Sequence, residues 1–228
     1  MKDNMKNIKK ALISAIAIVG LTTSAFAFEG FSVGASYSSA DFSTSGTEST
    51  AGANGTAMTT STSVTKKGSG DIGSIFAEYT FSQGSTIGID YVDGTATLGK
   101  ASRTSSTPSG TVTASAEISD PLTFYAEPTF MINDKFGVYL KGGVTELTVT
   151  PKEVDAASVT TSTYKAKDLY GQMLGYGAKF YMGNFFVKAE YVETDFGTYT
   201  HRSTTGEGNV ITADIDTEET KFALGYNF

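Results

Sequence analysis

The chain has 228 residues, of which 17 are basic and 24 acidic, so its formal net charge is −7. An acidic chain of this kind does not favour nucleic acid as a partner, because nucleic-acid binding needs a basic surface. There is no cysteine, which excludes a disulfide framework and a cysteine metal site. The length fits one domain. The mean hydropathy of −0.10 excludes a membrane protein built from helices.

The first 27 residues have the three parts of a secretory signal peptide. A lysine-rich start precedes an apolar run over residues 11–21, and Ala25-Phe26-Ala27 supplies a small-residue cleavage site. The alternative is a membrane anchor, but a helical span needs about 20 apolar residues and this run is shorter. We therefore expect residues 1–27 to be a cleaved signal peptide and residues 28–228 to form the exported domain.

Apolar and polar residues then alternate in eight separate runs. A period of two places the apolar side chains on one face of a strand and the polar ones on the other. Each run approaches the roughly 10 residues that a tilted strand needs to cross a bilayer. The eight runs are residues 31–37, 75–81, 87–91, 122–130, 136–144, 174–180, 185–191 and 222–228.

The connections between these runs are alternately short and long. Residues 82–85, 131–135 and 182–184 form tight turns, whereas the gaps 40–70, 93–120, 145–167 and 194–219 are long and polar. Short inner turns and long outer loops are typical of outer-membrane barrels. The alternative is a soluble eight-stranded barrel or sandwich, which would place its apolar residues inside. Strand-like alternation continues through 111–118 and 210–215, so we expect some strands to project beyond the membrane.

Eight charged residues fall on the polar face of the runs, which would turn toward the lumen. Four acids and four bases can neutralise one another there, whereas an isolated charge would be costly. Because eight strands enclose only enough room for side chains, we expect a structural plug. The alternative is a polar conduction path. The residues are Glu78, Asp90, Glu127, Lys141, Lys179, Lys188, Glu190 and Lys221.

Two further groups of charges lie in the long gaps. An acidic run near the outer rim lacks the spacing of a calcium-binding loop, so we interpret it as a solvated strand edge rather than a cation site. A set of basic residues is placed to contact lipopolysaccharide phosphates. The acids are Asp214, Asp216, Glu218 and Glu219, and the bases are Lys66, Lys67, Lys100, Arg103 and Arg202.

The chain ends on a strand with four large apolar groups two residues apart. These residues are Phe222, Leu224, Tyr226 and Phe228. A terminal aromatic ring suits an interfacial girdle at the membrane surface. This terminus resembles the final strand of bacterial outer-membrane β-barrels, in which the segment is read by the barrel-assembly machinery.

The chain as a whole resembles the small OmpA/OmpX-like barrels of Gram-negative bacteria. The resemblance implies an all-β fold, an eight-stranded antiparallel up-and-down transmembrane β-barrel in the cell outer membrane. It also implies a monomer that contacts outer-membrane lipids and lipopolysaccharide. Neither a cofactor nor nucleic acid is expected as a partner.

Three functions are consistent with this family. The first is a non-enzymatic structural or surface-interaction role, in adhesion or envelope integrity. The second is a narrow porin-like channel for ions or small solutes. The third is a lipid A-modifying enzyme, since some barrels of this size use a histidine with a serine, and His201 and Ser203 are neighbours. No carboxylate can be assigned to orient His201, so we expect no catalytic residues.

Overall fold

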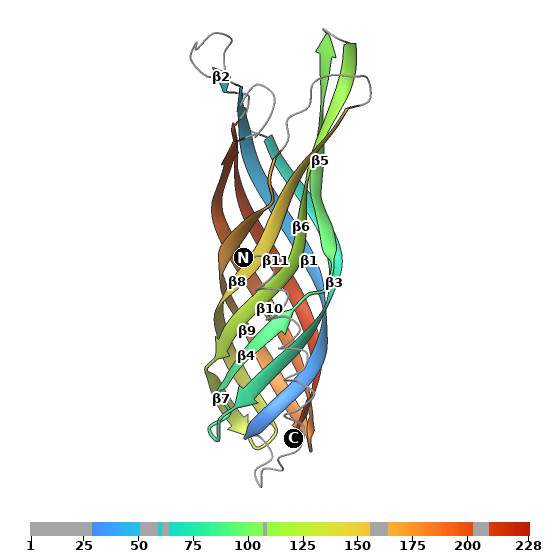
Figure 1. Ribbon diagram of the computed structural model, residues 1–228. Coiled ribbons are helices and arrows are strands. Elements are labelled where there is room, and N and C mark those ends of the chain that lie inside the picture. Colours follow the sequence, from blue (N-terminus) through green and yellow to red (C-terminus); the bar gives the residue numbers. More distant parts are fainter. Residues whose placement is uncertain (1–28, 51–58, 61–63, 107–108, 156–163, 203–209) are drawn as a thin grey trace.

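The computed structural model describes residues 29–50, 59–60, 64–106, 109–155, 164–202 and 210–228 (Figure 1). The expected signal peptide, residues 1–27, lies outside the described residues. Within them, no helix is long and apolar enough to cross a membrane.

The described residues form long β-strands joined by short turns. The alternating runs of the sequence fall on these strands, and the strands continue from the runs into the gaps interpreted as loops. The strands are β1 (Gly30–Thr50), β2 (Thr59–Thr60), β3 (Val64–Thr80), β4 (Thr86–Tyr91), β5 (Thr95–Ser106), β6 (Ser109–Glu127), β7 (Thr129–Asn133), β8 (Phe136–Asp155), β9 (Lys167–Met182), β10 (Phe185–Arg202) and β11 (Val210–Asn227).

The labelled strands close into one antiparallel barrel of eight strands, because some barrel strands are divided into two labelled elements. The first barrel strand, β1, pairs with the last, β11, and β6 pairs with β8, so the main sheet is closed. β4 and β5 are successive segments of one barrel strand, and β6 and β7 are successive segments of another. Pro128 separates β6 from β7, as expected for a residue that has no backbone N–H to donate. The predicted all-β, eight-stranded barrel is therefore confirmed.

The two faces of the barrel differ in chemistry. Large apolar side chains point outward, and Phe130 and Leu174 are each 72% exposed. The inward face carries charged side chains such as Lys179 and Glu127, both fully buried. A soluble barrel would have the opposite arrangement, because it buries apolar groups away from water. The outward band is instead the surface expected against lipid hydrocarbon.

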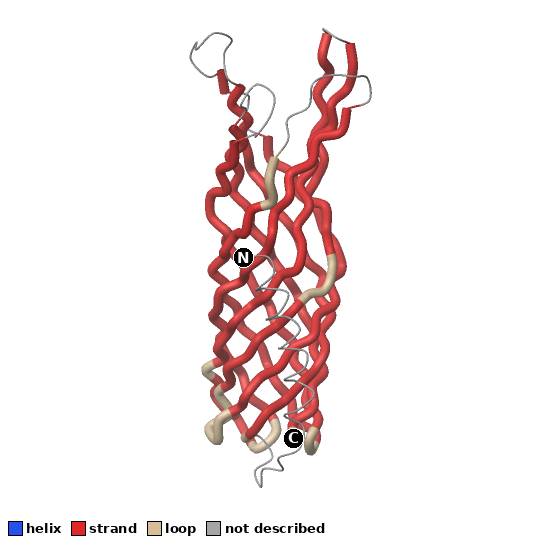
Figure 2. Tube along the Cα trace, in the orientation of Figure 1, coloured by secondary structure: helices blue, strands red, loops and turns tan. Residues whose placement is uncertain are grey.

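The two ends of the barrel also differ. One end holds the tight turns, where Gly84 and Gly183 adopt φ values of 88° and 65° that favour glycine. β1 begins and β11 ends at this turn end (Figure 1). At the opposite end the strands run on well beyond the apolar band, and the β5–β6 hairpin rises furthest (Figure 2). We call this the extended end.

Candidate functional site

The centre of the lumen holds six ionised side chains in mutual contact. Lys188 lies at its middle, with Nζ 2.8 Å from Glu127, 2.9 Å from Glu78 and 3.3 Å from Glu190. Three glutamates face three lysines, so the formal charges balance. We call this set the charge network; its members are Glu78, Glu127, Lys141, Lys179, Lys188 and Glu190.

The two other lysines complete the network. Lys179 Nζ is 3.0 Å from Glu78 and 3.4 Å from Glu127. Lys141 Nζ is 2.8 Å from Glu190 and 3.3 Å from Glu127. Each lysine therefore contacts at least two glutamates. All six residues are at most 4% exposed, and buried charges of this kind persist only when paired.

Two buried tyrosines hold the glutamates in place. The Tyr125 hydroxyl donates to Glu78 at 3.0 Å, and the Tyr139 hydroxyl donates to Glu190 at 2.7 Å. Lys141 Nζ also lies 4.0 Å from the centre of the Tyr125 ring, within cation–π distance. These hydrogen bonds to charged oxygens are of the stronger class. They fix Glu78 and Glu190 between a hydroxyl and the lysines.

Glycines make room for these aromatic rings. Gly177 lies directly opposite Tyr139 across the β8–β9 ladder, and Gly88 lies opposite Tyr125 across the β4–β6 ladder. A Cβ atom at Gly177 would lie 2.6 Å from the Tyr139 hydroxyl oxygen. The absence of a side chain at Gly177 and Gly88 therefore leaves the space that Tyr139 and Tyr125 occupy.

The remaining pair of predicted lumen charges lies apart from the charge network. Lys221 Nζ is 3.2 Å from Asp90 and 3.7 Å from Glu219, which also accepts a hydrogen bond from Ser38 at 3.0 Å. The structure thus brings six of the eight predicted residues into one cluster and places Asp90 with Lys221.

The sequence places Glu219 in the outer acidic run, but its contacts with Ser38 and Lys221 show that it faces the lumen. Its position two residues before Lys221 is the signal that assigns it to the inward face. Asp214, Asp216 and Glu218 point outward, and all three are exposed. In the described residues, no group of three or more histidines and carboxylates is placed to hold a metal ion.

Apolar side chains fill the lumen on both sides of the charges. Near the β9–β10 turn, Tyr181 and Phe186 pack with Phe76 and Ala223. Toward the extended end lies a larger cluster, which we call the apolar layer: Ile118, Leu147, Val149, Leu169, Phe196, Tyr199 and Ile215. A cavity of about 60 Å³ lies between the apolar layer and Lys141, Asp90 and Lys221. The sequence pattern predicts strand through Ile118 and Ile215 but not the apolar layer itself, because most other members, such as Leu147 and Phe196, lie in gaps interpreted as polar loops.

His201 lies beside the apolar layer. Its ring stacks on Tyr199 with centroids 5.8 Å apart and also meets Tyr164 at 6.1 Å. Burial, and then the nearby Lys167, lower the pKa of His201, so the neutral form is favoured. Burial raises the pKa of Tyr199 to about 12. Ser203 lies outside the described residues.

The basic residues proposed for lipopolysaccharide fall into two groups. Lys67 and Arg202 are exposed. The side chains of Lys66, Lys100 and Arg103 lie outside the part of the structure that is described.

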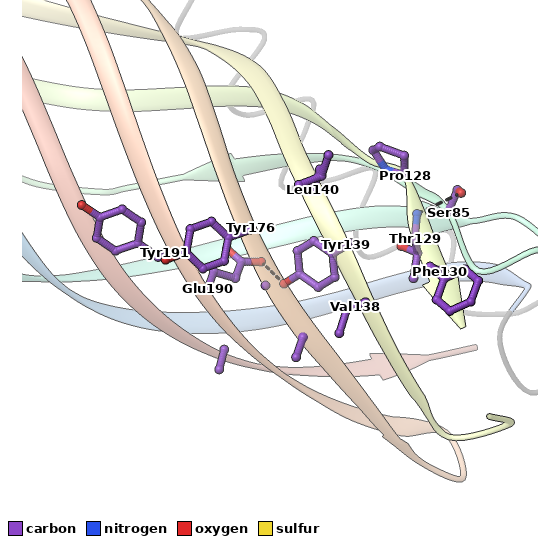
Figure 3. Close-up of a pocket in the computed structure, with 13 residues that line it drawn as sticks. Ser85, Pro128, Thr129, Phe130, Val138, Tyr139, Leu140, Tyr176, Glu190 and Tyr191 are labelled. Carbon is purple, nitrogen blue, oxygen red and sulfur yellow. Dashed lines mark hydrogen bonds between the residues drawn. The ribbon is translucent and has the colours of Figure 1, made fainter. Parts of the chain in front are cut away.

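A groove of about 910 Å³ lies on the outward face of β8, β9 and β10 (Figure 3). Small residues, Gly177, Ala178 and Ala189, form part of its lining beside Leu140 and Tyr176. The hydrogen bond from Tyr139 to Glu190 lies against this groove (Figure 3). Glu190 of the charge network and its partner Tyr139 are thus part of the lining of the groove.

The C-terminal residues secure the closing strand. The Phe228 N–H donates to the carbonyl of Phe31 at 3.0 Å, and the Phe228 ring meets Tyr226 edge-on at 5.2 Å. Phe222 and Leu224 point outward and are 61% and 55% exposed. Their role as an assembly signal remains a prediction.

Deleting Phe228 should reduce the yield of folded protein in the membrane. The deletion removes one hydrogen bond to β1 and one ring of the aromatic girdle at the closing seam. The measurement is the fraction of folded, heat-modifiable protein on a gel after expression. A Phe228→Tyr variant, which keeps the ring and the backbone N–H, is the control and should assemble normally. Normal assembly of the deletion would show that the terminal residue is dispensable.

The comparisons with known proteins agree with this geometry. The family model described as "Outer membrane protein beta-barrel domain" matches residues 12–228. No curated protein sequence matches the chain. Among solved structures, OprG from Pseudomonas aeruginosa has a TM-score of 0.52 at 10% identity and covers 89% of this chain and 98% of its own. That likeness shows the fold alone.

Two other solved structures are similar over most of the chain. Neisserial surface protein A has a TM-score of 0.41 at 16% identity, covering 86% of this chain and 99% of its own. AlkL has a TM-score of 0.44 at 14% identity, covering 91% and 94%. The family model spans nearly the whole chain and the structure is a closed barrel with an apolar outer band. The chain therefore belongs to the outer membrane protein β-barrel domain family, and its place is the outer membrane.

Proposed function

We propose that this protein is a plugged, non-enzymatic outer-membrane barrel that anchors and displays its extended end, in a structural or surface-interaction role. The observation that carries this proposal is the filled lumen. At the level of the charge network, Lys188 contacts three glutamates and is 3% exposed. A water-filled conduction path would leave such groups hydrated.

The energetics of the network support a plug. An ion would have to displace a lysine from its glutamates, and breaking a buried ion pair costs about 3–5 kcal/mol. The apolar layer then forms a second barrier in series, because Leu147 and Phe196 offer a permeating ion no polar partner. Bilayers that contain the purified protein should therefore carry no steady current.

The surroundings of His201 support a non-enzymatic role. Its described ring contacts are Tyr164 and Tyr199, and an activated serine would instead require the histidine to be oriented by a carboxylate or similar group. We also propose that lipids and lipopolysaccharide surround the barrel. Lys67 and Arg202, both exposed beyond the apolar band, are suited to meet lipid phosphates.

Display of the extended end can be tested with single cysteines, because the chain has none of its own. Cysteines at Thr97, Lys152 and Thr200, all exposed at the extended end, should react with a membrane-impermeant thiol reagent on intact cells. Cysteines at Gln83, Asp134 and Asn184, exposed in the turns, should react only after the cells are opened. The opposite pattern would mean that the barrel is inverted.

A further inference from the structure

The wall of the barrel has an open seam at the extended end, between β3 and β5. Below Ile75, β3 pairs with β4, but above it residues 64–74 pair only with β1. β5 in turn pairs only with β6. No other described strand joins either edge. The β5–β6 hairpin rises apart from the ends of β1 and β3 (Figure 1).

The backbone groups that point into the seam can be assigned. The Phe81 N–H donates to Ser85 in the β3–β4 turn, so odd-numbered residues of β3 direct their N–H and C=O groups toward the β4 side. The register between β1 and β3 has no bulge, and the assignment therefore holds along the strand. Above the end of β4, the groups of Lys67, Ser69, Asp71 and Gly73 point into the seam.

The opposite edge is similar. The Asp120 N–H donates to the Gly94 carbonyl, so even-numbered residues at the start of β5 face β6. Thr95 and Thr97 therefore face the seam. Neither face of β3 is covered here, since a Cβ atom placed on Gly68, Gly70 or Gly73 would meet nothing within 4 Å. An unpaired edge whose faces are uncovered is a template for another strand.

The two faces of the seam define the strand that would fit. On the lumen side, Ile72 and Val92 line the small cavity, and Ala96 packs on the apolar layer. On the outer side, Asp71 and Asp93 flank the lower end, where the edges converge, and both are exposed. Alternate residues of an added strand would thus meet apolar groups inside and carboxylates outside.

We propose that the β3 edge of this seam binds an extended polypeptide segment of a partner protein, with apolar and basic residues in alternation. Main-chain hydrogen bonds to Ser69, Asp71 and Gly73 supply affinity, and the inward and outward side chains supply specificity. This proposal names a partner class for the surface role proposed above. Its test does not involve conductance, so the two can fail separately.

The test uses a fluorescent peptide, Lys-Val-Lys-Val-Lys-Val-Lys, and the full protein in nanodiscs of zwitterionic phosphatidylcholine. We expect saturable binding by fluorescence anisotropy. A Lys-Lys-Val-Val-Val-Lys-Lys peptide has the same composition without the alternation, and it should bind at least about 10-fold more weakly. A peptide with N-methyl groups on a central lysine and on the valine next to it should also bind weakly, because it loses a donor on each of its two edges.

Protein variants then locate the site. Ser69→Pro removes a seam-facing N–H but no bond to β1, and proline is tolerated on such edges. Binding should fall about 10-fold, the equivalent of one lost hydrogen bond, while Ser69→Ala should bind normally. Asp71→Asn should weaken binding about 2- to 5-fold at low salt.

Several results would overturn the proposal. Absence of binding by the alternating peptide would do so. Equal binding of the alternating and block peptides would show mere charge attraction. Equal binding by Ser69→Pro and Ser69→Ala would place the peptide elsewhere. If Ser69→Pro failed to fold, the N-methylated peptide would decide, since its unchanged affinity contradicts strand addition.

Discussion

Replacing Lys188 with alanine should lower the free energy of unfolding by about 3–5 kcal/mol, the usual cost of breaking a buried ion pair. The change leaves three buried glutamates facing two lysines. Glu127 Oε1 and Glu78 Oε2 lose partners at 2.8 and 2.9 Å. The measurement is denaturant unfolding of the barrel in lipid vesicles, followed by circular dichroism.

Two variants make the Lys188 result specific. Lys152→Ala breaks a pair with Glu117 that is largely exposed, so it should cost less than about 1 kcal/mol. Lys188→Ala combined with Glu127→Gln restores equal numbers of buried acids and bases, so it should be more stable than Lys188→Ala alone. If the single and double variants had equal stability, charge balance would not be what holds the network together.

Replacing Gly177 with valine should be comparably damaging. The new Cβ would lie 2.6 Å from the Tyr139 hydroxyl oxygen and 2.7 Å from the backbone carbonyl of Ala189, which cannot rotate away. Overpacking typically costs about 1–3 kcal/mol. Displacing Tyr139 also loses its hydrogen bond to Glu190, which adds about 1.5–3 kcal/mol for a bond to a charged group.

Controls separate the two contributions at Gly177. Gly142→Val should be mild by comparison, since its Cβ meets only Leu174 at 3.9 Å. Tyr139→Phe keeps the ring but loses the hydroxyl, so its cost measures the hydrogen bond alone. The Gly177→Val variant should be less stable than Tyr139→Phe in the same unfolding assay. If Gly177→Val were as stable as Gly142→Val, Tyr139 would not be closely packed against residue 177.

Strand period explains which parts of this account the sequence predicts. The spacing of two residues assigns Lys179 and Lys188 to the inward face without knowledge of the fold. It does not reveal which glutamate each lysine meets. Lys179 and Glu78 are 101 residues apart, and Lys188 and Glu78 are 110 apart. Such pairs depend on how the barrel closes and how its strands are staggered.

The features that the sequence did not predict, the apolar layer and the seam, also have a physical explanation. Leu147 and Phe196 lie in polar segments, where a few inward apolar residues do not change the overall composition of a loop. Yet β8 runs on to Asp155 and β10 to Arg202, so these residues remain on strands and meet inside the barrel. The sequence does not predict the seam between β3 and β5 either. The seam begins where β4 ends at Tyr91, and the local composition does not indicate that end.

Single-channel recording tests most directly whether the charge network and the apolar layer close the lumen. Purified protein in a planar bilayer should give no steady unitary current. Lys188→Ala should also remain closed, because Leu147 and Phe196 still block the path. Large, steady currents from the unaltered protein, with ion selectivity that shifts toward cations in Lys188→Ala, would contradict the account and identify the barrel as a channel.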